Sequence, residues 1–224
     1  MLKAYIILID RNLTENEYRR LLRLASPERR ERAARLLRFG DRQRSIYGEL
    51  LARFALSSWL RIRPDRLAFA VGEHGKPEPL GRPEAHFNIS HSGRYVVCAA
   101  GDESVGIDVQ ETPEGRNYLR IAERYFHPDE LEYLLSFPAG ESRASAFTAV
   151  WTKKEAYTKF LGLGLALPPS SFCVFSLPDT AFHRILSERG AVCHVCSKSA
   201  AAPEVVRFTA SEFINEVFRS TAVP

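Results

Sequence analysis

The sequence predicts an α+β protein, and three observations point to that class. A strand, a group of helices and a set of short strands occur in that order roughly twice along the 224 residues. The sequence pattern changes near residues 101–106, which marks a possible boundary between the two halves. The composition, 45% hydrophobic and 26% charged, is that of a globular protein. Since no residue-level repeat is visible, the likeness of the halves rests on element order alone.

The first 60 residues predict one strand and three helices. Residues 3–9 are apolar, and an aspartate and an arginine follow where a signal peptide would have its cleavage site, so we expect a strand. Thr14 and Glu17 form a capping box for a helix to about residue 24. The Ser-Pro pair at 26–27 is a second helix start, and residues 41–60 keep the apolar spacing of a third helix.

The remaining chain predicts further β-rich and helical segments. The β-rich runs are 67–71, 86–90, 95–100 and 105–109, the helical stretches are 116–136 and 142–161, and later strands are expected near 172–175, 192–196 and 204–209, with Ser211 as the cap of a closing helix. We expect an N-terminal subdomain over 1–104 and a C-terminal subdomain over 105–224.

Charge is distributed unevenly. Residues 1–66 carry sixteen Lys/Arg against eight Asp/Glu, a net of +8, and the rest of the chain carries fifteen against nineteen, a net of −4. A basic half suits a polyanionic partner such as phosphates, nucleic acid or an acidic protein. For most of these arginines, however, a solvated place on a helix face is the simpler explanation.

No apolar run approaches the ~20 residues that span a bilayer, so we expect a cytoplasmic protein without membrane contact.

The cysteines do not predict a disulfide framework. Cys98, Cys173, Cys193 and Cys196 are few and irregularly spaced. Cys193 and Cys196 form a lone CxxC, and a zinc site needs about four ligands, so small, half-buried residues in a strand are favoured over a metal or redox site.

Two segments place acids and bases where metal and phosphate chemistry needs them. On a strand over 106–110, Asp108 and Gln110 share one face, where the aspartate is either a hard-metal ligand or a solvent-facing residue. On the helix over 142–161, Lys154 falls in the stripe that should be apolar, so a partner must offset its charge. A phosphate would pair with Lys154 and a metal ion with Glu155; an ordinary surface pair between Glu155 and Lys159 is the alternative.

A third segment, residues 87–100, contains the hydroxyl-rich turn Ser90-His91-Ser92-Gly93. Ser90, His91 and the backbone amides of this turn could hold a phosphate. A Ser–His nucleophile is disfavoured because adjacent side chains on a strand point apart and no GxSxG elbow is present. Residues 72–79 predict only a loop that contains Lys76.

These motifs together resemble the Sfp-type 4′-phosphopantetheinyl transferases. The resemblance rests on Gly106-Ile107-Asp108, Trp151-x-x-Lys154-Glu155-Ala156-x-x-Lys159, Phe87-Asn88-Ile89-Ser90-His91-Ser92 and Gly75-Lys76-Pro77, in the family's order, with weaker matches at 26–28, 124–126, 167–168 and 171–172. It implies two similar subdomains in a pseudo-twofold arrangement, with coenzyme A between them.

The resemblance also implies roles for single residues. Asp108 and Glu155 would bind Mg²⁺, with Mn²⁺ as an alternative, together with the pyrophosphate of coenzyme A. Gln110 stands where the family usually has a second carboxylate, so weaker metal binding is expected. Lys154 and Lys159 would contact the phosphates. The remaining cofactor-binding positions are Arg29, Arg32, Arg44, Ser90 and His91 near the 3′-phosphate, and Lys76 and Pro77 beside the adenine.

The expected reaction is transfer of 4′-phosphopantetheine to a serine of an apo acyl or peptidyl carrier protein, with release of 3′,5′-ADP. Glu155 is the expected general base, and Lys154 would stabilise the leaving phosphate. Family resemblance also suggests a monomer. Two alternatives stay open: a nucleic-acid-binding module on the Arg-rich helices, which lacks an aromatic-interleaved basic strand or a helix-turn-helix signature, and a carrier-binding homologue that has lost catalysis.

Overall fold

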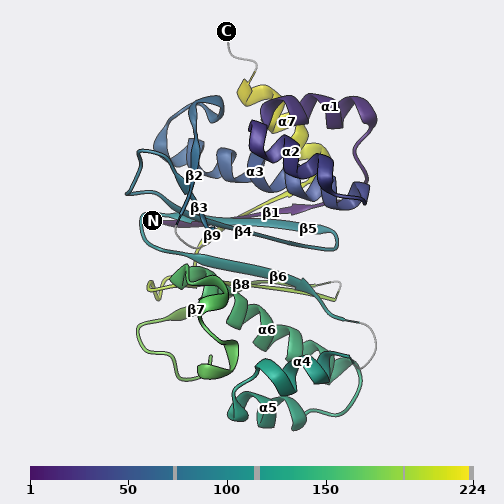
Figure 1. Ribbon diagram of the computed structural model, residues 1–224, viewed down its shortest axis with the longest axis vertical. Coiled ribbons are helices and arrows are strands. Elements are labelled where there is room, and N and C mark those ends of the chain that lie inside the picture. Colours follow the sequence, from purple (N-terminus) through teal and green to yellow (C-terminus); the bar gives the residue numbers. More distant parts are fainter. Residues whose placement is uncertain (73–74, 114–116, 189, 222–224) are drawn as a thin grey trace.

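The computed structural model describes residues 1–72, 75–113, 117–188 and 190–221, and it has four layers (Figure 1). Two sheets lie against each other in the middle, and helices cover the outer face of each. The α+β prediction with a sheet and helices in each part is confirmed. Residue 116, where the predicted helical stretch 116–136 begins, lies outside the described residues.

The N-terminal body is a four-stranded sheet in the order β4-β5-β1-β9. Its strands are β1 (Leu2–Leu8), β4 (His86–Ser92), β5 (Tyr95–Gly101) and β9 (Glu204–Thr209). The helices that cover it are α1 (Glu15–Leu24), α2 (Pro27–Arg35), α3 (Phe39–Leu60) and α7 (Ala210–Thr221). A short hairpin of β2 (Phe69–Val71) and β3 (Pro77–Pro79) lies beside them. Thr14 and Glu17 form the predicted capping box of α1.

The C-terminal body is a three-stranded sheet in the order β6-β8-β7. Its strands are β6 (Gly106–Glu111), β7 (Ala181–Glu188) and β8 (Ala191–Ser197), and its helices are α4 (Tyr118–Tyr125), α5 (Pro128–Leu135) and α6 (Glu141–Leu161). Helix α6 packs directly on β6 and β8 and carries the motif that includes Lys154 and Glu155.

Strand β5 is buried on both faces because it lies in the middle of the four layers. Val96, Cys98 and Ala100 pack against the helices of the N-terminal body. Tyr95, Val97 and Ala99 face the second sheet, where they meet residues of β6 and β8 such as Ile107 and Val195. The two-residue period of a strand therefore places one side of β5 in each core.

The predicted strand near 172–175 is wrong, and side chains explain why. The carbonyl oxygen of Phe172 accepts a hydrogen bond from Lys154 Nζ at 2.8 Å, and the N–H of Val174 donates to Glu130 Oε1 at 2.7 Å. The backbone groups of this β-rich segment are thus satisfied by an ion pair instead of a neighbouring strand.

Two further differences concern the end of the chain. Thr209, not Ser211, caps α7, because its hydroxyl accepts from Glu212 N–H while the Glu212 carboxylate accepts from Thr209 N–H. Strand β9 pairs parallel with β1, and α7 packs on the same sheet, so residues 204–221 join the N-terminal body. The division of the chain into 1–104 and 105–224 stays a prediction.

Strand β7 was not expected from the sequence.

Cys193 and Cys196 lie on opposite faces of β8, one between the sheets and one beneath α6. Both are fully buried, and burial raises the pKa of each thiol, to about 12 for Cys196. The expectation of small, half-buried residues in a strand is right about the strand and wrong about the burial, because both side chains lie inside a core.

Among the residues described, no helix combines the length and the apolar character that crossing a membrane requires.

Candidate active site

The site forms where β6 and α6 approach each other most closely, at Gly106. A Cβ atom at this position would lie 1.9 Å from the carbonyl oxygen of Ala156 and 2.5 Å from the backbone nitrogen of Phe160. Only glycine fits such a contact without moving the helix. The glycine and alanine of the two motifs therefore bring the acids of β6 and α6 to a common place.

Asp108 lies on β6 facing this junction and is 6% exposed. One oxygen, Oδ1, accepts two hydrogen bonds: from Ser90 Oγ at 2.7 Å and from Lys159 Nζ at 2.6 Å. Within the described part of the chain, no hydrogen bond reaches the other oxygen, Oδ2. The carboxylate is thus fixed through one oxygen and offers the second.

Glu155 is close enough to Asp108 for their charges to interact. The pKa of Glu155 is raised, first by burial and then by the negative charge of Asp108, while Lys159 opposes the rise. Two carboxylates whose charges interact, with one lysine bonded to Asp108, form a site that favours an added positive charge. Oxygen donors of this kind suit Mg²⁺, and Gln110, half-buried two residues along β6, could add an amide oxygen.

Lys154 is placed elsewhere. Its ammonium group is 1% exposed and forms an ion pair with Glu130 at 2.6 Å, and it lies 4.2 Å from the centre of the Phe172 ring. The sequence was right that Lys154 falls on a buried face and needs a partner. The structure shows Glu130 of α5 in that position, so Lys154 is not in contact with Asp108.

A cationic cluster adjoins the acids. The pKa of His91 is lowered, first because nearby protein atoms displace water from its ring and then by the positive charges of Arg44, Lys159 and Arg32, although the residue is exposed. Arg44 donates to the carbonyl oxygen of Gly93 at 2.9 Å, which holds it next to the turn that follows His91. These groups come from α2, α3, β4 and α6 and together suit an anion.

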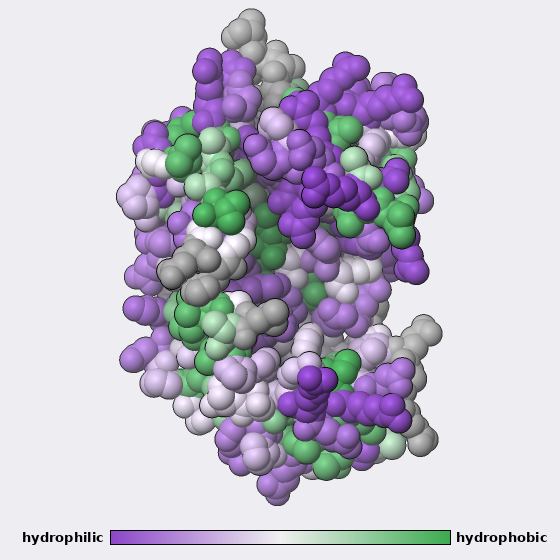
Figure 2. Space-filling view, viewed as in Figure 1, coloured by the Kyte–Doolittle hydropathy of each residue, from purple (hydrophilic) through white to green (hydrophobic). Residues whose placement is uncertain are grey.

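A cavity of about 630 Å³ lies in the N-terminal body; its lining includes Arg32 of this cluster but neither Asp108 nor Glu155. Figure 2 shows hydrophilic side chains gathered over the helices of that body, around a hollow with apolar residues in its floor. Arg29, Arg32 and Pro77 line the cavity, together with apolar residues such as Phe69 and Ile89.

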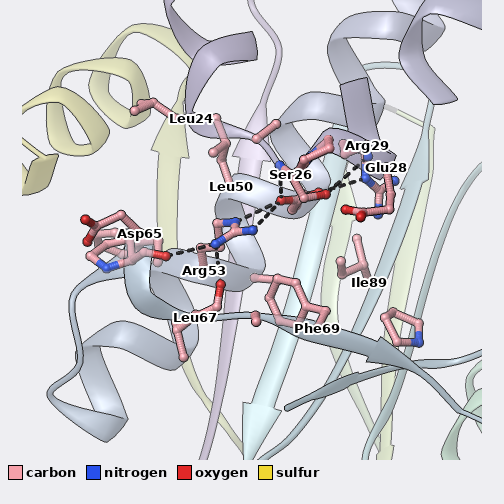
Figure 3. A pocket seen from close by; sticks show the side chains of 18 of the residues that line it. Leu24, Ser26, Glu28, Arg29, Leu50, Arg53, Asp65, Leu67, Phe69 and Ile89 are labelled. Carbon is pink, nitrogen blue, oxygen red and sulfur yellow. Dashed lines mark hydrogen bonds and ion pairs between the residues drawn. The ribbon is translucent and has the colours of Figure 1, made fainter. Parts of the chain in front are cut away.

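Glu49, 3% exposed, organises the wall of the cavity that carries Ser26, Arg29 and Arg53. Figure 3 shows these three side chains around the cavity. The Glu49 carboxylate accepts hydrogen bonds from the N–H and hydroxyl of Ser26, from Arg29 Nε at 3.2 Å and from Arg53 Nε at 2.8 Å. Burial and these donors have opposite effects on the pKa of Glu49, and the net result is a lowered value. Sequence reasoning missed this residue, since nothing local marks it as a partner of Arg29.

Lys76 joins the two bodies instead of standing free. Its ammonium group donates to the carbonyl oxygens of Lys159 at 2.8 Å and Val105 at 3.3 Å. Burial lowers its pKa. It therefore bonds the last turn of α6, where exposed carbonyls attract a cation.

Three side chains of β4 hold β6 in place, and we call this set the side-chain ladder. The backbone N–H groups of Ile107, Val109 and Glu111 donate to the side-chain oxygens of Asn88 at 3.0 Å, Ser90 at 3.3 Å and Ser92 at 3.1 Å. The acceptors alternate along β4, so they lie on one face. That alternation in the sequence run 88–92 is the signal that could have predicted the ladder.

The chain is similar to known proteins along nearly its whole length. Residues 12–103 match the family described as 4′-phosphopantetheinyl transferase, N-terminal, and residues 104–211 match the 4′-phosphopantetheinyl transferase superfamily. The chain is 38% identical over 173 residues to the 4′-phosphopantetheinyl transferase Sfp of Bacillus subtilis (strain 168), covering 77% of this chain and 76% of that protein.

Two other relatives extend the comparison. The 4′-phosphopantetheinyl transferase gsp of Aneurinibacillus migulanus is 34% identical over 174 residues, 78% of this chain and 71% of the relative. The 4′-phosphopantetheinyl transferase psf-1 of Bacillus pumilus is 33% identical over 217 residues, 91% of this chain and 92% of the relative. This chain belongs to the Sfp-type 4′-phosphopantetheinyl transferase family and is an enzyme of that class.

Proposed function

We propose that this enzyme transfers the 4′-phosphopantetheine group of coenzyme A to a serine hydroxyl of an apo acyl or peptidyl carrier protein, with Mg²⁺ or Mn²⁺, and releases 3′,5′-ADP. The observation that carries the proposal is the meeting of Asp108 of β6 with Glu155 of α6, next to Lys159 and the cationic cluster. Such a combination can hold a cation and a pyrophosphate at once.

The metal would be held by Asp108 and Glu155, with Gln110 as a neutral third donor. The donor set fits a hard cation, because every candidate ligand atom is an oxygen and Asp108 Oδ2 has no other partner within the described residues. When bound, the cation would offset negative charge on the pyrophosphate.

Glu155 is proposed as the group that accepts the proton of the carrier serine. A carboxylate at this place can accept a proton, and in the site without a cation burial and the charge of Asp108 raise its pKa. The serine oxygen forms a bond to the β-phosphorus, the bond from that phosphorus to the bridging oxygen breaks, and the bridging oxygen leaves on 3′,5′-ADP. Lys159, already beside Asp108, would neutralise part of the phosphate charge.

The remaining cofactor-binding residues divide between two places. Arg32 and Arg44 would supply positive charge for the phosphates of coenzyme A, and His91, whose lowered pKa keeps its ring neutral, would offer a ring N–H. Arg29 and Pro77 line the cavity that would take the nucleotide end. Direct phosphate contacts by Lys154, Lys76 and Ser90 stay predictions, since their polar atoms are bonded to protein groups here.

The test is incubation with coenzyme A, Mg²⁺ and a panel of apo carrier proteins, followed by the intact mass of each carrier. One carrier should gain the mass of one phosphopantetheine group, and EDTA should prevent the gain. Glu155→Gln should reduce transfer strongly, whereas Glu141→Gln, an exposed change on the first turn of the same helix, should not. No gain on any carrier with folded wild-type enzyme would contradict the proposal.

The same assay separates the alternatives. A homologue that has lost catalysis would bind carriers without modifying them. A nucleic-acid-binding module would bind duplex or single strands with an affinity that falls steeply with salt. The choice of carrier and pathway, the monomeric state and the cytoplasmic location stay predictions.

A further inference from the structure

We propose that Ser90 is a positioning residue for Asp108, which aims the Oδ2 atom of that carboxylate at the cation, and that it does not bind the 3′-phosphate of coenzyme A. The proposal rests on the proposed function and departs from the role that the family resemblance implies for Ser90. It starts from the middle rung of the side-chain ladder, which is the one rung that also touches Asp108.

The hydroxyl of Ser90 has no proton left to donate to a phosphate. It has one proton, and that proton is donated to Asp108 Oδ1 at 2.7 Å. One of its lone pairs accepts from the N–H of Val109 at 3.3 Å. Ser90 is 8% exposed, so a phosphate could reach this hydroxyl only after the bond to Asp108 had broken.

Ser90 and Lys159 approach the same oxygen of Asp108. Together they hold the rotation of the carboxylate, so that Oδ2 is the atom left for a ligand. Lys159 is 26% exposed and sits on a flexible stem, whereas Ser90 is anchored in β4 and tied to β6 by its own ladder bond. We therefore assign the larger part of the orientation to Ser90.

The ladder provides a matched control. Ser92→Ala makes the same chemical change two residues away and removes the acceptor of Glu111 N–H, but Ser92 does not touch Asp108. Both variants leave one backbone N–H of β6 without its side-chain acceptor, so both should lose some stability. Only Ser90→Ala should change the metal site. If Ser90→Ala does not fold, Ser90→Cys takes its place in the experiment. It keeps a side chain of similar size and replaces the hydroxyl, a strong hydrogen-bond donor, by a thiol, a weak one.

The first measurement is the affinity for Mn²⁺. It is monitored by electron paramagnetic resonance, with coenzyme A present and the carrier protein absent. Ser90→Ala should weaken the affinity by about 10-fold to 100-fold, the range seen when a partner of a metal ligand is removed. Ser92→Ala should leave it unchanged. Equal Mn²⁺ affinities for Ser90→Ala and wild type would overturn the proposal.

The second measurement is the rate of transfer with coenzyme A and with 3′-dephospho-coenzyme A as a function of Mg²⁺. A positioning role predicts that Ser90→Ala raises the Mg²⁺ requirement equally with both donors. A phosphate-binding role predicts instead a raised KM for coenzyme A alone, with the same Mg²⁺ requirement, and that result would also overturn the proposal. If wild type transfers nothing, the proposed function fails, while the Mn²⁺ measurement still decides the role of Ser90.

Discussion

Replacing Lys154 by methionine should lower the melting temperature of this enzyme, because it strands a buried carboxylate. Lys154 and Glu130 are 1% and 0% exposed, and their charged groups lie 2.6 Å apart. Removing one partner of such a pair costs about 3–5 kcal/mol, since the other charge stays buried without compensation. For a chain of this size, about 2–4 °C per kcal/mol converts that loss into a fall in Tm of about 6–20 °C.

The assay is thermal and urea denaturation of Lys154→Met beside Lys153→Met. Lys153 is the neighbouring lysine on α6 and forms no ion pair within the described residues, so its substitution should shift Tm far less. The double variant Lys154→Met/Glu130→Gln should be more stable than Lys154→Met, because the stranded charge is gone. A Tm for Lys154→Met within about 2 °C of wild type would refute the reasoning.

The double variant also tests the catalytic role of Lys154. Its transfer rate per folded molecule shows what the ammonium group contributes to phosphate transfer apart from its pair with Glu130. A rate close to that of wild type would mean that the role of Lys154 lies in holding α5 against α6.

Substitutions at Gly106, Gln110 and His194 test three other features of the molecule. Gly106→Ala should destabilise the fold by about 1–3 kcal/mol, since the added methyl group meets the backbone of Ala156; urea denaturation measures this, and an unchanged midpoint would contradict it. Gln110→Glu should lower the Mg²⁺ concentration needed for half-maximal transfer, because a carboxylate adds charge to the donor set; an unchanged requirement would show that residue 110 is not a ligand. Burial lowers the pKa of His194 to about 3, against 6.5 for a free histidine. Between these two pH values the unfolded chain binds a proton at this residue that the folded chain does not. The free energy of unfolding therefore falls as the pH drops from 6.5 towards 3. His194→Asn should remove up to about 1.4 kcal/mol per pH unit of that slope in urea titrations, and an equal slope in both proteins would contradict this.

Local patterns allowed much of the fold to be predicted. The capping box of Thr14 and Glu17 and the Ser-Pro start at 26–27 depend on neighbours within four residues, and both begin helices as expected. The two-residue period of β6 placed Asp108 on a polar face, and the motif on α6 supplied Glu155. The charges of the two acids interact across a junction where Gly106 allows the helix to approach the strand, a closeness that spacing alone could not establish.

Features that depend on distant partners could not be predicted. The partner of Lys154 is Glu130, 24 residues earlier, and the segment near 172–175 completes the same ion pair. Glu49 shapes the cavity by bonding Ser26 and Arg29, again more than 15 residues away. In each case a single buried charge is ambiguous in the sequence, because several charged residues could satisfy it and only packing chooses one.

The pairing of β9 with β1 has a consequence for how the chain matures. During synthesis, the first hundred residues emerge with one side of β1 lacking its neighbour, and with the apolar surface that Phe213 and Ile214 later cover still open to water. That surface closes only after residues 204–221 have left the ribosome and returned to the start of the polypeptide. A nascent chain stalled before residue 204 should therefore be a target for chaperones and proteases, even though every residue of the proposed metal site has already been made.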